Sequence, residues 1–316
     1  MKPIKIAVLM DDIKDIKPHK DSSLAMMLEA TKRHWEIYTF DSRDLFAKEG
    51  QVFASCAKTH VFDDTQHWYE KEPETELALE DFNVILMRKD PPFDMNYIYA
   101  TYFLEQAEKK GVLIVNKPQS LRDANEKFFA LNFPHCIAKT LVSSNQKQLK
   151  SFINAQNVGV VKPLDGMGGK DIFKLEQGDG NINKVLDYLT HQGSVPIMAQ
   201  EFLPEIVQGD KRILLINGQP IDYALARMPA KGSFKGNLAA GATGVGQPLT
   251  GRDRYLCEQI APTLKAKGLM FVGLDVIGDY ITEINVTSPT CIRELDEQFN
   301  LNIAGVLFDA IEKALN

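Results

Sequence analysis

Two neighbouring apolar segments that contain acidic residues limit most strongly how this chain can fold. Between Phe271 and Val286, runs of Val, Ile and Leu typical of two strands are interrupted by Asp275, Glu283 and Asn285. Burying carboxylates among aliphatic side chains is costly unless a cation compensates. Oxygen ligands of short reach suit Mg²⁺, which normally also takes phosphate oxygens and water. The pattern predicts a metal–nucleotide site on a β-hairpin; the alternative is an edge hairpin whose acids face solvent.

The turn of this hairpin decides whether the three polar side chains lie together. Glu283 and Asn285 share a strand face because side chains alternate with a period of two. Asp275 joins that face if the loop contains three residues, Gly278-Asp279-Tyr280, whereas a two-residue Gly278-Asp279 turn places Asp275 opposite Thr282. A shared metal site requires one face, so we predict the three-residue loop.

Size and composition exclude several classes of protein. A chain of 316 residues, 44% of them apolar, can form two or three packed units. No apolar run approaches the roughly 20 residues of a membrane span, and the start of the chain lacks a secretory signal pattern, so we expect a cytoplasmic protein without a membrane partner. A net charge of −6 without a basic cluster argues against nucleic acid. The four cysteines are scattered, and we expect reduced thiols.

The first part of the chain, residues 1–122, has the pattern of an α/β domain. The apolar run Ile4–Met10 predicts a strand, and Asp21 precedes an amphipathic helix. The same alternation continues along this part of the chain, which predicts a doubly wound parallel sheet covered by helices. The further elements expected are the strands Trp35–Phe40, Asn83–Met87 and Val112–Asn116 and a helix near Tyr97–Lys110.

The remaining chain divides into a small α+β lid, residues 123–199, and a C-terminal antiparallel sheet, residues 200–316. Asn217-Gly218 separates two strand-like segments as a type I′ hairpin turn does. The glycine-rich segment Met228–Gly244 has few large apolar residues and predicts a mobile loop. In the lid we expect a helix near Leu121–Asn132, strands at Thr140–Ser143, Val158–Lys162 and Asp171–Leu175, and a helix from Asn145.

A second candidate site is the segment Lys162–Lys170, where a lysine at a strand end precedes a glycine-rich turn. Glycines allow backbone N–H groups to converge on anionic oxygens, and the lysine adds a point charge against phosphates. An ordinary hairpin loop is the alternative, because the segment is neither a Walker A sequence nor a dinucleotide-binding fingerprint. The glycines concerned are Gly166, Gly168 and Gly169.

Several further residues gain meaning beside these two sites. Arg212 and Arg227 flank the Asn-Gly turn and could form a guanidinium pair for a carboxylate or acyl phosphate; otherwise they are surface ion-pair partners. Arg88 follows a strand, at the kind of carboxyl end where ligands bind in open α/β sheets, although a rigid turn is an equal explanation. Cys291 is either a nucleophilic thiol or, more simply, a small buried residue.

The order and spacing of these residues resemble the ATP-grasp superfamily and, within it, the bacterial glutathione synthetases. The resemblance spans the chain. It is most specific in four segments: Met87–Asp94, Val115–Asp123, Lys162–Gly169 and Thr282–Cys291. It implies an ATP-grasp fold and an enzyme that ligates γ-glutamylcysteine and glycine through an acyl phosphate. Another ATP-grasp carboxylate–amine ligase, such as a peptide ligase, is the alternative. Family membership further implies small-molecule substrates, Mg²⁺ with Mn²⁺ as a substitute, and a homotetramer.

The resemblance also implies a role for each matching position. Magnesium would bind Asp275, Glu283 and Asn285. The γ-glutamylcysteine and glycine side would be formed by Arg88, Arg212, Arg227, Asn285, Ser288, Pro289 and Thr290, with Arg212, Arg227, Lys162 and Asn285 closest to the reaction. The nucleotide would be held by Lys127, Lys162, Gly166, Gly168, Gly169, Gln200, Glu201, Phe202, Leu203, Asp210 and Asp275.

Overall fold

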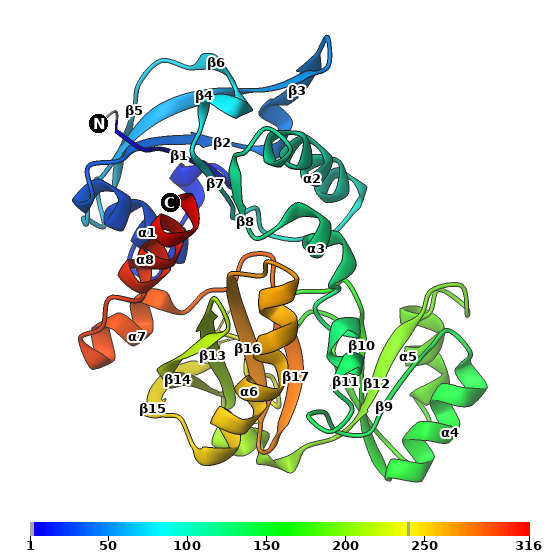
Figure 1. The fold of residues 1–316 in the computed structure, drawn as a ribbon. Helices are drawn as coiled ribbons and strands as arrows, with labels where there is room; N and C mark the ends of the chain where they lie inside the picture. Colours follow the sequence, from blue (N-terminus) through cyan, green and yellow to red (C-terminus); the bar gives the residue numbers. More distant parts are fainter. Residues whose placement is uncertain (1–2, 239–240) are drawn as a thin grey trace.

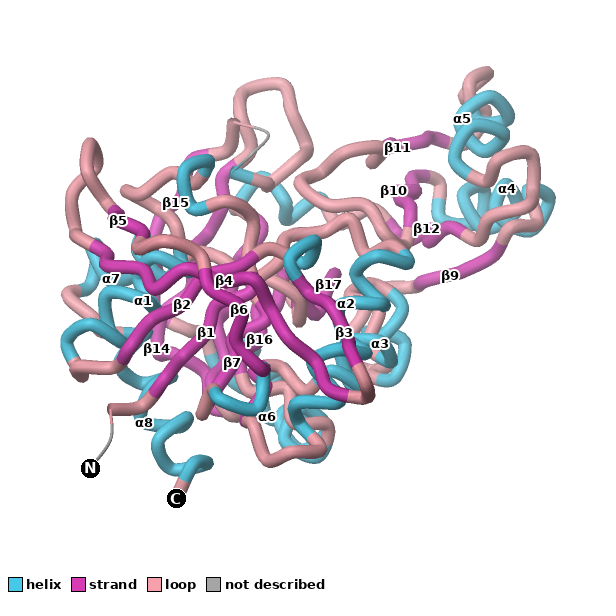
Figure 2. The backbone as a smooth tube through the Cα atoms, turned by 90° about the horizontal axis from the view of Figure 1, so that it is seen from above, coloured by secondary structure: helices cyan, strands magenta, loops and turns pink. Residues whose placement is uncertain are grey.

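Three β-sheets organise the chain in a computed structural model that describes residues 3–238 and 241–316 (Figure 1). The N-terminal sheet contains β1–β8, the lid sheet β9–β12, and the C-terminal sheet β13–β17. Figure 2 shows the lid projecting sideways from the rest of the molecule. The predicted combination of an α/β unit, a small α+β lid and an antiparallel sheet is therefore observed. Among the described residues, no helix is both long and apolar enough to span a bilayer.

The N-terminal sheet has the predicted parallel centre. Strand β1 (Lys5–Leu9) lies between β2 (Glu36–Phe40) and β7 (Val84–Met87), and β8 (Leu113–Val115) extends the sheet beyond β7. Helix α1 (Ser22–Lys32) begins at Asp21, whose side chain accepts a hydrogen bond from the Leu24 amide at 2.6 Å. Helix α2 (Met95–Glu108) is capped in the same way by Asp94.

An antiparallel extension of this sheet was not predicted. Strand β4 (Gln51–Val61) pairs antiparallel with β2, and its other partners are β3 (Leu45–Lys48), β5 (Tyr69–Lys71) and β6 (Thr75–Ala78). The sheet is therefore mixed rather than purely parallel. The small and polar residues of β4, among them Ala54, Ser55 and Lys58, give a weak strand pattern, and pairing along both edges of the strand compensates for it.

The lid is a four-stranded antiparallel sheet with two helices. Its strand order is β11-β10-β12-β9, and Leu149, Ile153, Val161, Leu186 and Ile197 form part of its own core. The elements are β9 (Thr140–Ser143), α4 (Gln146–Gln156), β10 (Val158–Pro163), β11 (Phe173–Glu176), α5 (Ile182–Leu189) and β12 (Ile197–Glu201).

The predicted helix near Leu121–Asn132 is wrong as one continuous element. Helix α3 (Pro118–Asp123) ends at Asp123, and a separate 3-10 helix covers Phe128–Asn132. Asn125 explains the new start, because its side-chain oxygen accepts hydrogen bonds from the amides of Lys127 and Phe128 at 3.2 and 2.9 Å. The non-helical residues between the two helices reach the site described below.

The C-terminal sheet has the order β15-β14-β13-β16-β17 and is antiparallel throughout. Asn217 and Gly218 have φ angles of 46° and 72°, which confirms the predicted type I′ turn. Part of the predicted loop Met228–Gly244 is a strand, since β15 begins at Thr243; residues 239 and 240 of that loop lie outside the described residues. The elements are β13 (Asp210–Ile216), β14 (Gln219–Met228), β15 (Thr243–Pro248), α6 (Gly251–Ala266), β16 (Phe271–Ile277) and β17 (Tyr280–Asn285).

The hairpin of β16 and β17 corrects the predicted three-residue loop. Ile277 pairs with Tyr280, so the turn has two residues, Gly278 and Asp279. Asp275 nevertheless pairs with Glu283, because the register shifts by one residue at a β-bulge that leaves Thr282 without a partner residue. The proposed loop was wrong, whereas the shared face of Asp275 and Glu283 is observed.

The end of the chain returns to the N-terminal unit. Helix α7 (Ile292–Phe299) leads to α8 (Ile303–Leu315), which packs against α1 (Figure 1). Arg33 at the end of α1 connects the two helices: Nε lies 2.8 Å from Glu29 Oε1, Nη2 lies 2.7 Å from Asp309 Oδ1, and Nη1 lies 3.0 Å from Glu312 Oε1.

Replacing Arg33 with Met should lower the free energy of unfolding by about 1.5–3 kcal/mol, the range for hydrogen bonds to charged groups. Urea unfolding measures the change. Lys32→Met is the matched control, since Lys32 is largely exposed and its ammonium lies 3.9 Å from Glu29; its effect should stay within about 0.5 kcal/mol. Equal effects of the two substitutions would show that the Arg33 contacts do not hold α8.

Candidate active site

Two cavities meet at the polar face of the C-terminal sheet. The first, of about 720 Å³, lies between the lid and this sheet and includes Val160, Lys162, Gln200 and Leu203 in its wall. The second, of about 1500 Å³, is bounded by the N-terminal unit and the same sheet and includes Arg212, Asn285 and Ser288. The residues that line both cavities are Asn237, Asp275 and Glu283.

One face of the sheet gathers six of the polar residues singled out from the sequence. Asp210 pairs with Arg227, Arg212 with Asp275, and Asp275 with Glu283, so these side chains point to the same side as Asn285. The opposite face is apolar and contains Ile213, Leu274 and Ile284. A cluster of charges is thus built on a strand framework that is anchored by an apolar core shared with the N-terminal unit.

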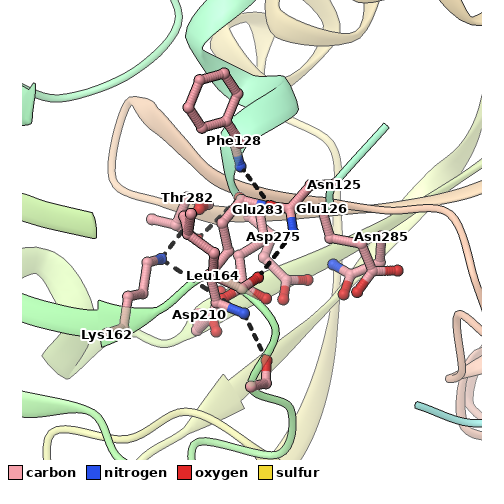
Figure 3. Close-up of polar contacts among 12 residues, drawn as sticks. Asn125, Glu126, Phe128, Lys162, Leu164, Asp210, Asp275, Thr282, Glu283 and Asn285 are labelled. Carbon is pink, nitrogen blue, oxygen red and sulfur yellow. Dashed lines mark hydrogen bonds and ion pairs between the residues drawn. The ribbon is translucent and has the colours of Figure 1, made fainter. Parts of the chain in front are cut away.

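Two lysines surround Glu283, and Figure 3 shows one of them, Lys162. Glu283 Oε1 lies 3.5 Å from Lys162 Nζ and 3.7 Å from Lys127 Nζ, and both lysines are buried. Burial alone would raise the pKa of the carboxyl, but the lysine charges hold it below its usual range. Burial lowers the pKa of Lys162, although Glu283 opposes this effect. The two lysines can exchange their ion pairs with Glu283 for phosphate oxygens, and Glu283 can exchange its ion pairs for a divalent cation.

The bulge at Thr282 supplies a further contact for Lys162. Its ammonium donates to the Thr282 carbonyl at 3.2 Å (Figure 3), while the Thr282 hydroxyl donates to the carbonyl of Asp275 at 3.2 Å. The irregularity therefore both aligns Asp275 with Glu283 and holds the lysine of the glycine-rich segment beside them.

Two arginines surround Asp275. Arg212 donates from Nε at 2.6 Å and from Nη2 at 3.1 Å, and Arg227 Nη2 lies 2.9 Å away. Burial acts to raise the pKa of Asp275, yet both guanidinium groups together keep it well below its usual range. Arg227 also reaches Asp210 Oδ2 at 2.5 Å, but burial raises the pKa of Asp210, and its Oδ1 has no hydrogen-bond partner among the residues that the structure describes.

The glycine-rich turn lies against the lysines. Gly168 and Gly169 have φ angles of 63° and 78°, which residues with a side chain rarely adopt. Lys127 Nζ donates a hydrogen bond to the Gly166 carbonyl at 2.5 Å. A Cβ atom on Gly169 would approach Asn237 Oδ1 to 2.6 Å. These residues enclose a small space of about 230 Å³ together with Lys162 and Glu283. The arrangement offers backbone groups and lysines to a phosphate chain.

The lid end of the first cavity combines apolar side chains with the end of strand β12. Gln200, Glu201, Phe202 and Leu203 line it together with aliphatic side chains of the lid. Glu201 and Phe202 donate their amides to the carbonyls of Lys139 and Val158, so the strand end is held in place. Pockets with apolar walls and a few fixed polar groups suit a base such as adenine.

The second cavity contains the predicted substrate residues except one. Asn285, Ser288, Pro289 and Thr290 line it, together with both arginines. Arg88 lines a separate space of about 220 Å³, where it donates to Ser23 Oγ and to the Pro289 carbonyl, each at 3.0 Å. The structure thus places Arg88 behind the Ser288–Thr290 segment.

Cys291 does not have the surroundings of a nucleophile. It is buried, and burial raises the pKa of its thiol, although Arg212 and Arg227 oppose this effect. The thiolate is the reactive form of cysteine. The simpler sequence interpretation, a small buried residue, therefore agrees with the structure.

Sequence reasoning missed three groups at the site. Asn237 lines both cavities from the loop before β15, and Glu126 lies in the break between α3 and the following 3-10 helix. Asp11 and Asp12 line the second cavity directly after β1. Only the aspartates had a usable signal, because ligands gather at the carboxyl ends of parallel strands.

The oxygen-bearing side chains of β16 and β17 are suited to a hard cation. In the described part of the chain, no three His, Cys, Asp or Glu side chains are clustered closely enough to hold a metal ion by themselves. Asp275, Glu283 and Asn285 nevertheless share one face. Two carboxylates and an amide fit Mg²⁺, which takes its other ligands from phosphates and water.

Family models account for most of the chain. Residues 4–122 match the prokaryotic glutathione synthetase N-terminal domain, and residues 126–300 match the ATP-grasp domain of the same family. A glutathione synthetase of Pseudomonas syringae pv. tomato is 54% identical over 312 residues, 99% of this chain and 98% of the relative. One of Coxiella burnetii is 51% identical over 309 residues, 98% of this chain and 96% of the relative.

Solved structures of low sequence identity share the fold. D-cycloserine synthetase DcsG aligns with a TM-score of 0.68 at 13% identity, over 99% of this chain and 100% of that chain. D-alanyl-alanine synthetase A of Vibrio cholerae aligns with a TM-score of 0.60 at 11% identity, over 100% and 99% of the two chains. At such identities the likeness establishes the ATP-grasp architecture alone.

Proposed function

Because the chain belongs to the prokaryotic glutathione synthetase family, we propose that it joins γ-glutamylcysteine to glycine while ATP is cleaved to ADP and phosphate. Membership makes the chain an ATP-dependent carboxylate–amine ligase of the ATP-grasp type. The observation that supports the reaction most directly is the junction of two cavities at Asp275 and Glu283, where two lysines meet two arginines.

The nucleotide occupies the first cavity in this proposal. Gln200–Leu203 hold the adenine, Asp210 the ribose, and Lys127, Lys162 and the glycines at 166, 168 and 169 the phosphates. Asp275, Glu283 and Asn285 hold Mg²⁺ or Mn²⁺, which when bound neutralises phosphate charge. The γ-phosphate then lies where the two cavities join.

The acceptor of the phosphoryl group occupies the second cavity. The cysteinyl carboxylate of γ-glutamylcysteine attacks the γ-phosphorus, the bond to ADP breaks, and an acyl phosphate forms. Glycine gives up one ammonium proton to become the free amine, which attacks the acyl carbon. Phosphate then leaves, and the nitrogen gives up a second proton to solvent and keeps one as the amide forms. Arg212 and Arg227 face the negative charge of both steps, as positioned cations do in phosphoryl transfer. No enzyme nucleophile takes part, in agreement with the buried thiol of Cys291.

The segment from Met228 to Gly244 closes the junction in this proposal. Asn237 contacts the glycine-rich turn and lines both cavities, so this segment separates the reacting groups from water. Exclusion of water protects an acyl phosphate from hydrolysis. We assign the units 1–122, 123–199 and 200–316 to substrate binding, the lid and catalysis, with the end of the lid moved from residue 199 to Glu201, where the lid strand β12 ends. A cytoplasmic homotetramer completes the proposal; the four buried free cysteines fit a reducing compartment.

The decisive experiment measures ADP release with γ-glutamylcysteine and glycine, each omitted in turn. We expect sustained ADP release only when both substrates are present, and formation of the tripeptide in equal amount. A panel of other dipeptides and amino acids tests the alternative of a different ATP-grasp ligase. Faster release with another pair would assign the chain to that substrate class, and release without any acceptor would contradict ligation.

A further inference from the structure

We propose that Asn116 is a positioning residue, whose side chain sets the place of the N-terminal unit relative to the metal-bearing strands β16 and β17. The inference rests on the proposed function, because it explains how the acceptor is aligned with the phosphoryl group. Asn116 follows β8, where the N-terminal unit meets the C-terminal sheet (Figure 1). It is buried outside both large cavities, so its effect on the reaction has to pass through the residues that it holds.

The carboxamide of Asn116 is bonded to both strands of the hairpin. Its nitrogen donates to the carbonyls of Phe271 and Val286, each at 2.8 Å, and its oxygen accepts from the Phe271 amide at 2.9 Å. Phe271 is the first residue of β16, and Val286 follows the last residue of β17. The side chain therefore closes the open end of the hairpin as a backbone amide would, and both of its N–H groups have a partner.

The packing between the two units leaves room at this point. The space of about 220 Å³ that Arg88 lines is also bounded by Val115, Asn116, Phe271 and Thr287. Val115 and Phe271 belong to one buried apolar cluster, but apolar attraction has no preferred direction. Hydrogen bonds have a narrow range of length and angle. The three bonds of Asn116 therefore define how the units are oriented where side chains do not fill the space between them.

The chain segment after β17 is held at the same place. Glu126 Oε1 accepts from the Val286 amide at 2.8 Å, while Asn116 binds the carbonyl of the same residue. Arg88 then donates to the Pro289 carbonyl at 3.0 Å, and Pro289 lines the second cavity. A displacement of Asn116 would thus move one wall of the second cavity relative to the metal-bearing strands.

The two cavities should depend on Asn116 to different degrees. The first cavity is lined by residues of the lid and the C-terminal sheet, whereas the second is bounded by the N-terminal unit and that sheet. Displacement of the N-terminal unit therefore alters the place of γ-glutamylcysteine but not that of the nucleotide. Phosphoryl transfer should be sensitive to this change, because a misplacement of about 1 Å can cost about 100-fold in rate.

Asn116→Ser tests the positioning role in a protein that should still fold. The shorter side chain leaves room for a water molecule, which can bond to the three freed backbone groups. We expect kcat/KM for γ-glutamylcysteine to fall about 10- to 100-fold, the cost of a small misplacement. The KM for ATP and the affinity for Mn²⁺ in the presence of ADP should not change. Asn116→Thr, which fills more of the vacated space, is a second variant with the same expectation.

Ser120→Ala is the matched control. Ser120 is a buried residue of α3, and its hydroxyl donates to the Lys267 carbonyl. It therefore joins the same two units, at the turn after α6 instead of at the metal-bearing strands. We expect this variant to lose some stability in urea unfolding but to keep wild-type kinetics with all three substrates.

Three outcomes would overturn the proposal. Wild-type kinetics in both Asn116 variants would show that its bonds do not position the units. An equal kinetic loss in Ser120→Ala would show that any weakened contact between the units has the same effect. A parallel loss of ATP and Mn²⁺ binding in the Asn116 variants would show that Asn116 shapes the hairpin itself. Failure of the proposed function differs from these, since the wild-type protein would then not ligate glycine.

Discussion

Replacing Glu283 with Gln should lower kcat/KM about 100-fold and raise the Mg²⁺ concentration needed for half-maximal activity. The side chain keeps its shape but loses the charge that lies 3.5 and 3.7 Å from two buried lysines. Loss of one strong electrostatic contact in a water-poor site costs about 10²–10³-fold in rate. Steady-state rates of ADP release over a Mg²⁺ titration measure both effects.

A structural loss has to be separated from this functional loss. Without Glu283, the ammonium groups of Lys127 and Lys162 remain buried near each other, so the unfolding temperature should also fall. Binding of Mn²⁺ to the folded fraction, followed by electron paramagnetic resonance with ADP present, reports the metal site directly. Glu176→Gln on the exposed edge of the lid is the control. Wild-type Mn²⁺ affinity in Glu283→Gln would remove Glu283 from the metal site.

The face shared by Asp275 and Glu283 was predictable, but the way in which the chain achieves it was not. Alternation along strands predicts which residues of β17 share a side. The number of turn residues was then inferred by assuming a regular ladder. A bulge at Thr282 breaks that assumption, and Thr and its neighbours have no composition that distinguishes a bulged from a regular strand.

Local turn chemistry was the most dependable signal along this chain. Asn217-Gly218 requires positive φ at both positions, and the structure has them. The break after α3 also has a local cause, because the side chain of Asn125 caps the turn that follows it. The helical periodicity on both sides concealed this cap, and with it the position of Glu126.

Residues that act across units could not be found from one sequence. Asn237 meets the glycine-rich turn from a segment more than sixty positions later in the chain, and β4 is stabilised by strands on both sides despite its weak pattern. The contact of Asn237 leaves no local trace, because it depends on segments far apart in the chain, whereas β4 also pairs with the adjacent β3 through the two-residue turn Glu49-Gly50. The charged clusters were predictable, because an acidic residue within an apolar strand is visible in the sequence whichever strand it pairs with.

Replacing Arg227 with Met should lower the free energy of unfolding by about 3–5 kcal/mol, the range for removing one partner of a buried ion pair. The guanidinium bridges Asp210 at 2.5 Å and Asp275 at 2.9 Å, and all three side chains are buried. Its loss leaves two carboxylates with Arg212 as their only nearby cation among the contacts described. Urea unfolding measures the change, and Arg254→Met, which breaks an exposed pair with Asp222, should cost less than about 1 kcal/mol.

The double variant Arg227→Met/Asp210→Asn should recover part of the lost stability, because it removes one of the two stranded charges. Burial already raises the pKa of Asp210 in the wild-type fold. A raised pKa means that the folded protein holds the proton more tightly, so wild-type stability should fall as pH rises from the ordinary Asp value through the raised one. Asp210→Asn should lack this fall. If the double variant were no more stable than Arg227→Met, repulsion between Asp210 and Asp275 would not explain the loss, and Arg227 would act by packing alone.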